Sequence, residues 1–239
     1  METQFGLEAL RDVRAVLFDL DGTLYRQSPV QKRMAMELLM LPVLTFSPTK
    51  TRRVWKVIKG YRELHEMIRD RGHSEESLHE LQLDETARRT GIDPQDVREI
   101  VQEWMLRRPL PFVTSAMRPG LTSFLAQLEA WGLERGVLSD YPVEGKLNAL
   151  GLGDAFSLQL CSSDAAINAL KPHPRGMLHA CERWGLQPHQ VLYVGDRIEV
   201  DGAGARNAGM PGAIITTKVT GEWCFAGFDA LQRTFEEHR

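Results

Sequence analysis

Two kinds of hydrophobic pattern divide the chain. Short runs of apolar, β-prone residues occur at 13–18, 133–138, 156–160, 191–194 and 212–216. Runs this short and this apolar are typical of strands that are buried on both faces of a parallel sheet. From residue 26 to about 115 no such run occurs, and apolar residues recur at helical spacing instead. We therefore expect a sheet whose sequence is interrupted by a helical segment.

The segment 26–115 contains four helix-start signals. In three of them a side chain that can cap a helix directly precedes a proline, and in the fourth a serine precedes two glutamates. The four capping residues are Ser28, Ser47, Ser74 and Asp93. The predicted helices cover residues 29–40, 48–71, 75–90 and 94–107, and the second and third end at Gly72 and Gly91. One apolar stripe along the second helix consists of Val54, Val57, Ile58, Tyr61 and Leu64.

After residue 115 predicted helices alternate with the predicted strands. These helices cover residues 120–131, 142–151, 174–184, 201–208 and 229–237. Such alternation with short connections predicts right-handed βαβ units, and hence a parallel sheet with helices on both faces. The expected fold is α/β, with a core formed by residues 1–25 and 116–239 and an inserted helical bundle at 26–115. Sheets of this kind bind ligands at the carboxyl ends of their strands.

Composition narrows the classes of function. The chain has 239 residues, of which 43% are hydrophobic and 26% charged, as in ordinary globular proteins. No apolar run has the length of a membrane span, and the first residues lack a basic segment followed by an apolar one, so we expect a cytoplasmic protein. A net charge of −3 gives no reason to expect nucleic acid or a membrane as partner. The three cysteines are far apart, which argues against a disulfide framework or a structural zinc site.

The first predicted strand ends in two acids, Asp19 and Asp21, followed by Gly22. If the chain stays extended there, both carboxylates project to the same side. Like charges this close favour either a bound hard cation or a shared proton, which would serve as a general acid. The alternative reading is a polar turn that leaves the strand.

Three further polar segments could reach the same edge of the sheet. Two of them come directly after predicted strands, and the third lies in the loop before a predicted helix. They are Ser139-Asp140, the lysine of Lys171-Pro-His-Pro, and the two acids of Gly-Asp196-x-x-x-x-Asp201. A hydroxyl with exposed backbone N–H groups is what a phosphoryl oxygen needs. Taken singly, a serine that ends a strand is common in turns, and most lysines are solvated surface residues.

Together the four segments resemble, in order, the four motifs of the haloacid dehalogenase superfamily. The first is Asp-Leu-Asp-Gly-Thr at 19–23, and the last is Gly-Asp followed by a second acid and small residues at 195–209. Asp140 departs from the resemblance, because the superfamily usually has asparagine there. The helical segment lies between the first and second motifs, where the superfamily's first type of cap domain is inserted. The resemblance implies a Rossmann-like core with a mobile helical lid.

The resemblance also implies a phosphatase that works through a phospho-aspartyl enzyme. Asp19 is then the nucleophile, and Asp21 the acid and base. Ser139, Lys171 and the backbone N–H of Asp140 bind the phosphoryl oxygens. We expect the Asp140 carboxylate to point away from a phosphate or to pair with a cation, since it would otherwise repel it.

The implied cofactor is Mg²⁺. The residues that would hold it are Asp19, the backbone carbonyl of Asp21, and Asp196. Asp201 is expected to orient water or neighbouring backbone groups. The expected partner is a small phosphorylated metabolite, and the protein is expected to be a monomer or a homodimer.

Three other functions remain as alternatives. A phosphomutase on a sugar phosphate uses the same core residues, so they do not separate it from a phosphatase. A 2-haloacid dehalogenase is disfavoured, because that branch lacks an acid at the position of Asp21. A non-catalytic binding module would be expected to lack Asp19, Asp21, Lys171 or Asp196, and all four are present. The lid has 16 Lys and Arg against 13 Asp and Glu, which suits an anionic substrate and equally a solvated surface.

Overall fold

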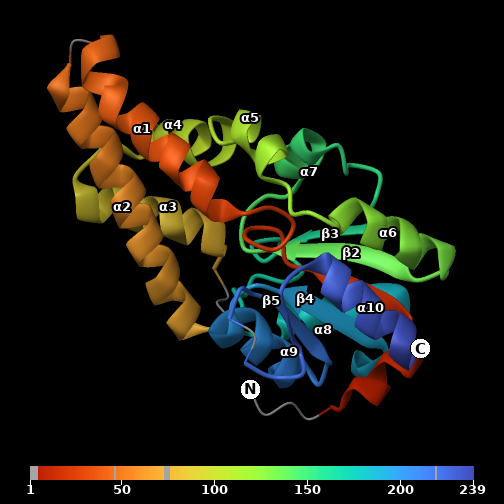
Figure 1. Ribbon diagram of the computed structural model, residues 1–239. Helices are drawn as coiled ribbons and strands as arrows, with labels where there is room; N and C mark the ends of the chain where they lie inside the picture. The colour runs from red at the N-terminus through yellow and green to blue at the C-terminus, as the bar shows by residue number, and fades with distance from the viewer. Residues whose placement is uncertain (1–4, 46, 73–75, 219) are drawn as a thin grey trace.

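The computed structural model describes residues 5–45, 47–72, 76–218 and 220–239. It has two parts, a parallel sheet with helices on both faces and a bundle of helices that lies at one edge of that sheet (Figure 1). Phe5 and Arg239, the first and last residues that the structure describes, both lie on the sheet part. None of the helices in the described ranges is long and apolar enough to cross a membrane.

Six parallel strands form the sheet, in the order β3-β2-β1-β4-β5-β6. Their bounds are Ala15–Phe18 (β1), Glu134–Ser139 (β2), Leu158–Cys161 (β3), Val191–Gly195 (β4), Gly212–Ile215 (β5) and Cys224–Phe225 (β6). Every residue of β1 is buried between β2 and β4. The parallel sheet confirms the predicted fold class, and β6 is a short edge strand that the sequence pattern did not indicate. All six carboxyl ends therefore lie at one edge.

The sheet packs against a layer of helices on each face. On one face Phe18 meets Phe124 of α6 (Leu121–Ala130) and Phe228 of α10 (Phe228–His238). On the other, Leu17 packs in one cluster with Met177 of α8 (Arg175–Trp184) and Ala205 of α9 (Ala203–Ala208). Because Leu17 and Phe18 are adjacent on a strand, they point to opposite faces, and β1 supplies side chains to both layers.

Shorter helical segments complete the core. A 3-10 turn at Leu7–Asp12 precedes β1, α7 (Glu144–Leu150) follows β2, a 3-10 turn at Pro188–Gln190 precedes β4, and a π-helical turn at Ile198–Gly202 leads into α9. The sequence pattern predicted α7 but neither of the two 3-10 turns.

The bundle contains α1 (Gln27–Thr45), α2 (Pro48–Arg71), α3 (Leu78–Thr90) and α4 (Pro94–Val101), followed by a π-helical turn at Gln102–Arg107. Two further turns, α5 (Leu110–Val113) and a 3-10 turn at Thr114–Ala116, lead back to the sheet. The apolar stripe on α2 joins the bundle together, because Val57 and Tyr61 pack against α3 and α4.

The predicted caps are partly right. The side chains of Ser47 and Asp93 accept hydrogen bonds from the N–H groups of Lys50 and Gln95, as expected. Gly91 ends α3 in the left-handed conformation. Ser28, however, lies inside α1, so its assignment as a cap was wrong. Ser74 lies outside the described residues, and α3 begins at Leu78 with Ser77 as its cap, later than the predicted start at 75.

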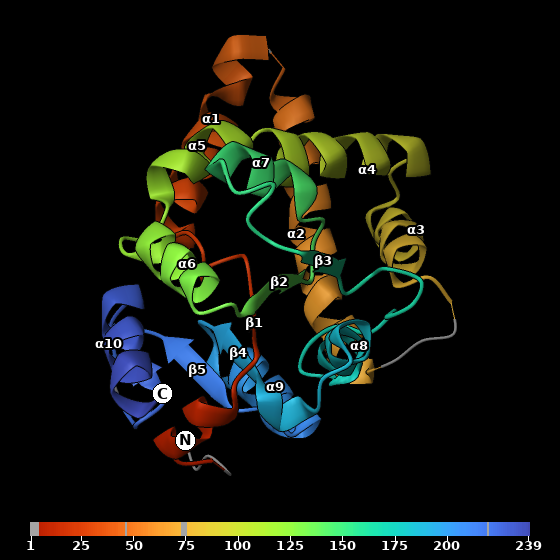
Figure 2. The same cartoon turned by 90° about the vertical axis from the view of Figure 1, so that its right-hand side faces the viewer.

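The chain enters and leaves the bundle through two adjacent segments. The N–H of Arg26 donates to the carbonyl of Ala116, and the N–H of Arg118 donates to the carbonyl of Leu24. Figure 2 shows the bundle standing over the edge of the sheet where β1 and β2 end. The predicted domain boundaries, at 25/26 and 115/116, stay a prediction.

Candidate active site

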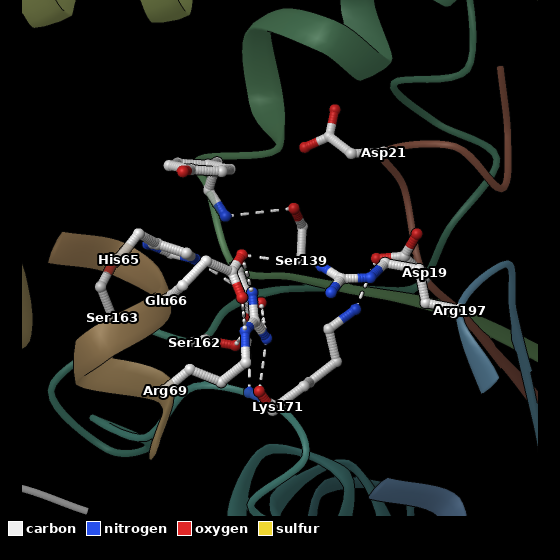
Figure 3. A network of polar contacts seen from close by, with 12 residues as sticks. Asp19, Asp21, His65, Glu66, Arg69, Ser139, Ser162, Ser163, Lys171 and Arg197 are labelled. Atoms are coloured by element: carbon white, nitrogen blue, oxygen red, sulfur yellow. Dashed lines mark hydrogen bonds and ion pairs between the residues drawn. The ribbon is translucent and has the colours of Figure 1, made fainter. Parts of the chain in front are cut away.

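Asp19 follows β1 directly and is fixed from several sides. Its backbone N–H donates to the carbonyl of Val194 at 2.8 Å, which ties the end of β1 to β4. Its carboxylate accepts a hydrogen bond from Lys171 Nζ at 2.5 Å (Figure 3). It accepts a second one from the hydroxyl of Thr23 at 2.9 Å. Asp19 is only 4% exposed, so the sheet edge presents a buried and well-held carboxylate.

Lys171 brings a buried positive charge to the site from the loop that follows β3. Its Nζ also lies 2.8 Å from Asp201 Oδ1 and 3.1 Å from the hydroxyl of Tyr193. Burial by itself lowers the pKa of a lysine, but the charges of Asp19 and Asp201 raise the pKa of Lys171 well above its ordinary value. The lysine therefore stays charged beside Asp19.

Three carboxylates meet at this point of the sheet edge. One oxygen from each of Asp19, Asp196 and Asp201 lies within 4.8 Å of the other two. Gly22 makes room for one of them, because a Cβ built there would lie 2.2 Å from Asp196 Oδ2. Burial, and next the charge of Asp201, raises the pKa of Asp196 to about 6.

This donor set fits a hard divalent cation. Burial raises the pKa of Asp19 most strongly, and the positive charge of Lys171 opposes this effect. The negative charges of Asp201 and Asp196 raise the pKa of Asp19 further. Two buried acids, Asp19 and Asp201, and the half-buried Asp196 stand against one buried lysine, which leaves an excess of negative charge. A cation that takes carboxylate oxygens, such as Mg²⁺, would neutralise it.

Asp201 also holds the loop that follows β4. Its Oδ2 accepts the backbone N–H groups of Asp196 and Arg197, at 3.2 and 3.0 Å, while its Oδ1 accepts from Lys171 and Tyr193. These contacts are of the orienting kind expected for Asp201. The sequence did not indicate that its carboxylate would also join the acidic cluster.

Asp21 lies outside that cluster. Its two carboxylate oxygens accept hydrogen bonds from Lys146 Nζ of α7, at 2.6 and 2.5 Å, and the hydroxyl of Tyr25 donates to one of them. In Figure 3 its carboxylate points away from that of Asp19. β1 ends at Phe18, and Asp19 and Asp21 both line the same cavity, but their carboxylates are held by different lysines, Lys171 and Lys146.

Ser139 is the last residue of β2, which flanks β1 on the side away from β4, and Asp140 follows it. The hydroxyl of Ser139 accepts the N–H of Tyr141 at 3.2 Å. The Asp140 carboxylate accepts from Arg69 Nη1 at 2.9 Å and from the hydroxyl of Ser162 at 2.7 Å. It is thus paired with a cation, which is one of the two arrangements expected for an acid at this position.

Charge compensation is strong at Asp140. Burial by itself raises the pKa of a carboxyl, but contact with the ring of His65, 3.8 Å away, and the charges of Lys171 and Arg69 hold the pKa of Asp140 well below its usual range. The acid that departs from the superfamily pattern is therefore ionised and compensated.

A cavity of about 300 Å³ lies between the sheet edge and the bundle. Asp19, Ser139, Lys171 and Asp196 line it from the core. From the bundle it is lined by Gln31 and Met34 of α1, Arg62, His65 and Arg69 of α2, and Trp104. The predicted core residues therefore face a closed-in space that the bundle completes.

Several residues of the site were not singled out from the sequence, among them Thr23, Tyr25, Arg69, Lys146 and Tyr193. Thr23 belongs to the first motif and could have been found from it. Arg69 and Lys146 reach the site only through the packing of α2 and α7 on the core, and no local pattern marks them.

The family model of the haloacid dehalogenase-like hydrolases matches residues 13–209. A glyceraldehyde 3-phosphate phosphatase of Methanopyrus kandleri is 29% identical over 201 residues, which cover 83% of this chain and 82% of the relative. A phosphoglycolate phosphatase of Shigella boydii is 28% identical over 223 residues, which cover 88% of this chain and 84% of the relative.

Among solved structures, a 2-haloacid dehalogenase of Pseudomonas syringae superposes with a TM-score of 0.64. It is 21% identical, and the match covers 95% of this chain and 100% of that one, so this likeness concerns the fold. The family match extends over all four motifs and confirms the predicted resemblance and the predicted enzyme class. The chain belongs to the haloacid dehalogenase-like hydrolase family.

Proposed function

We propose that the protein is a Mg²⁺-dependent phosphatase that hydrolyses a small phosphate monoester through a phospho-aspartyl form of Asp19. The observation that carries this proposal is the Asp19 carboxylate, held between Lys171 and Thr23 within a cluster of acids and facing the cavity. The names of the two relatives, both phosphatases of small phosphorylated compounds, support the same activity.

In the first step Asp19 attacks phosphorus and the bond to the leaving alkoxide breaks. Covalent catalysis of this kind divides one difficult hydrolysis into two easier steps. Lys171, the hydroxyl of Ser139 and the N–H of Asp140 stabilise the charge that spreads over the equatorial oxygens. Lys171 contributes to this from a position 2.5 Å from Asp19.

Asp19, Asp196 and the backbone carbonyl of Asp21 would hold Mg²⁺. When bound, the cation neutralises the repulsion between an anionic nucleophile and an anionic substrate. The fit rests on the excess of negative charge among the three acids at the sheet edge.

Asp21 protonates the leaving alkoxide and then accepts a proton from the water that attacks the acyl phosphate, releasing Asp19 and inorganic phosphate. Its carboxylate is bound to Lys146 and Tyr25 in the present arrangement. An in-line displacement places the leaving oxygen on the side of phosphorus away from Asp19, so the Asp21 carboxylate, which lines the same cavity, has to exchange its contacts with Lys146 and Tyr25 for that oxygen.

The substrate is a small phosphorylated metabolite. A cavity of about 300 Å³ is at the lower end for small-molecule sites, which suits a phosphoryl group with a short organic part. The bundle contributes polar and cationic side chains to it, Gln31 and Arg62 among them. The oligomeric state, a monomer or a homodimer, and the cytoplasmic location stay predictions.

A screen of phosphate esters with Mg²⁺, scored by release of inorganic phosphate, tests the proposal. A hydroxylamine-sensitive phosphoryl label should accumulate on the enzyme during turnover. Transfer of the phosphoryl group to another hydroxyl of a sugar, with no free phosphate, would instead identify a phosphomutase. Absence of both reactions across the screen would refute the proposed activity.

A further inference from the structure

One side chain of the bundle reaches deep into the core. Arg69, near the end of α2, has a side chain that is only 9% exposed. Its Nη1 donates to Asp140 Oδ2 at 2.9 Å and also to the backbone carbonyl of Lys171 (Figure 3). Its Nε donates to Glu66 at 3.0 Å, on the same helix. The guanidinium therefore bridges two loops of the core.

Asp140 completes this bridge from the other side. Its Oδ1 accepts the backbone N–H of Lys171 at 3.3 Å, while its Oδ2 accepts from Arg69. The N–H and the carbonyl of Lys171 are thus both held by the Arg69–Asp140 ion pair. The hydroxyl of Ser162, at 2.7 Å, fixes the carboxylate that joins them.

The same lysine carries the charge that meets the nucleophile. Lys171 Nζ lies 2.5 Å from Asp19 Oδ1, so a shift of the Lys171 backbone moves the charge relative to the reacting group. Displacements of about 1 Å in a positioning contact cost on the order of 10²-fold in rate.

We propose that Arg69, acting through Asp140, is a positioning residue that sets Lys171 against Asp19. The bundle then contributes to the chemical step, and not only to the choice of substrate. The pair also explains why an acid occupies position 140: a neutral asparagine would leave the buried guanidinium of Arg69 without a carboxylate partner on the core. This inference rests on the proposed phosphatase function.

Steady-state kinetics with p-nitrophenyl phosphate separates positioning from substrate binding, because this small ester depends little on contacts to its organic part. Arg69→Gln should lower kcat by roughly 10- to 100-fold and change KM by less than about 3-fold. Asp140→Asn should lower kcat in the same way. Arg69→Lys keeps the charge but not the planar fork, so it should restore part of the rate.

The double variant tests the Arg69–Asp140 ion pair in a second way. Because both changes act on one ion pair, Arg69→Gln with Asp140→Asn should lower kcat by no more than about 3-fold beyond the worse single variant. A matched control is Arg98→Gln, since Arg98 forms its ion pair with Glu80 inside the bundle and does not reach the core. That variant should retain the wild-type kcat.

A measurement without turnover tests the geometry directly. In protein labelled with [¹⁵N]lysine, the Lys171 amide should shift and exchange its hydrogen faster in Arg69→Gln and Asp140→Asn, and not in Arg98→Gln. If the wild-type protein has no activity, the phosphatase function is refuted. The shift and hydrogen exchange of the Lys171 amide would still show whether the Arg69–Asp140 pair positions Lys171.

Three results would overturn the inference: an unmoved Lys171 amide, an unchanged kcat in both single variants, or a raised KM with kcat intact. The last would make Arg69 a substrate contact. If Arg69→Gln fails to fold, Asp140→Asn and Arg69→Lys carry the same comparison with smaller changes.

Discussion

The two walls of the cavity differ in charge and in how that charge is compensated. The sheet edge gathers Asp19, Asp196 and Asp201 around a single lysine, so acids are in excess. The face of α2 presents Arg62, Glu66 and Arg69 to the same space. Arg69 is paired with Glu66 and Asp140, so Arg62 carries the positive charge of this wall that no described carboxylate compensates. A negative wall suits a metal ion and a nucleophile, and a positive wall suits an anionic substrate. The reacting groups are thus assigned to the sheet edge and the recognition of substrate to the bundle, which reaches the chemical step only through Arg69.

The walls also differ in how their residues are ordered. The groups on the sheet edge come from loops that directly follow parallel strands, and neighbouring strands fix them, as Val194 fixes Asp19. The groups on α2 depend on how the bundle docks, and Arg69 is held because it pairs with Asp140 across the interface. The predictions below test whether chemistry and recognition separate along this line.

The largest effect is expected at the nucleophile. Asp19→Asn should lower turnover by at least about 10⁴-fold and abolish the hydroxylamine-sensitive phosphoryl label. The fold should survive, because the raised pKa of Asp19, caused first by burial, shows that its ionised form is costly in the metal-free site. Phosphate release and thermal unfolding of the same preparation check both statements. A label that still accumulates would place the nucleophile elsewhere.

Removal of the metal should have the next largest effect. Excess EDTA should abolish phosphate release, and added Mg²⁺ should restore it. Undiminished turnover in EDTA would remove the metal from the mechanism and leave the acidic cluster without its proposed partner.

The same cluster gives metal-free protein a pH dependence. The pKa of Asp196 is raised from 3.8 to about 6 by burial and by Asp201, so the folded protein binds more protons than the unfolded chain between these values. Stability without metal should therefore fall as the pH rises from about 4 to 6. Above pH 6, Mg²⁺ should stabilise the protein most, since Asp196 is then ionised. Thermal unfolding with EDTA or Mg²⁺ checks this, and Asp196→Asn should flatten the profile.

The same difference between the walls explains which site residues could be predicted from the sequence. Asp19, Ser139, Lys171 and Asp196 each follow a strand or lie at a helix entry, so spacing along the chain was enough to bring them to one edge. The orientation of Asp21 could not be found in this way. Whether its carboxylate meets Asp19 or Lys146 depends on where α7 packs, which no residue near Asp21 encodes.

The bundle shows the same limit. Two of its helices, α2 and α4, begin at predicted caps, and the stripe on α2 packs as predicted. The start of α3 and the role of Arg69 depend instead on contacts with residues far away in the chain. Asn168 of the core, for example, accepts the backbone N–H of Leu78, the first residue of α3.

A smaller and more selective effect is expected at Asp21. Asp21→Asn should slow hydrolysis of an alkyl phosphate by roughly 10²- to 10⁴-fold, the usual worth of general acid catalysis. Mg²⁺ affinity should stay nearly intact, because the metal is assigned to the backbone carbonyl. On an aryl phosphate the leaving group needs less protonation, so a burst of phenol followed by slow turnover is expected. Equal steady-state rates of mutant and wild type on both esters would show that Asp21 is not the acid and base.

The smallest effect should come from the positive wall. Arg62 lines the cavity and has no carboxylate partner among the residues that the structure describes, whereas Arg69 is committed to Asp140. A carboxylate on the organic part of a substrate would supply such a partner. One charge-assisted hydrogen bond is worth about 1.5 kcal/mol, which corresponds to roughly a tenfold change in affinity.

The test compares two esters of the same size, 3-phosphoglycerate and glycerol 3-phosphate, which differ in a carboxylate against a hydroxymethyl group. Arg62→Gln should raise KM for the acid about tenfold more than for the alcohol. The control is Arg88→Gln, an exposed arginine of the bundle that pairs with Glu85 away from the cavity. If Arg62→Gln raises KM equally for both esters, Arg62 does not recognise the organic part of the substrate. Selection of substrate must then come from the uncharged residues around Trp104 and Met34.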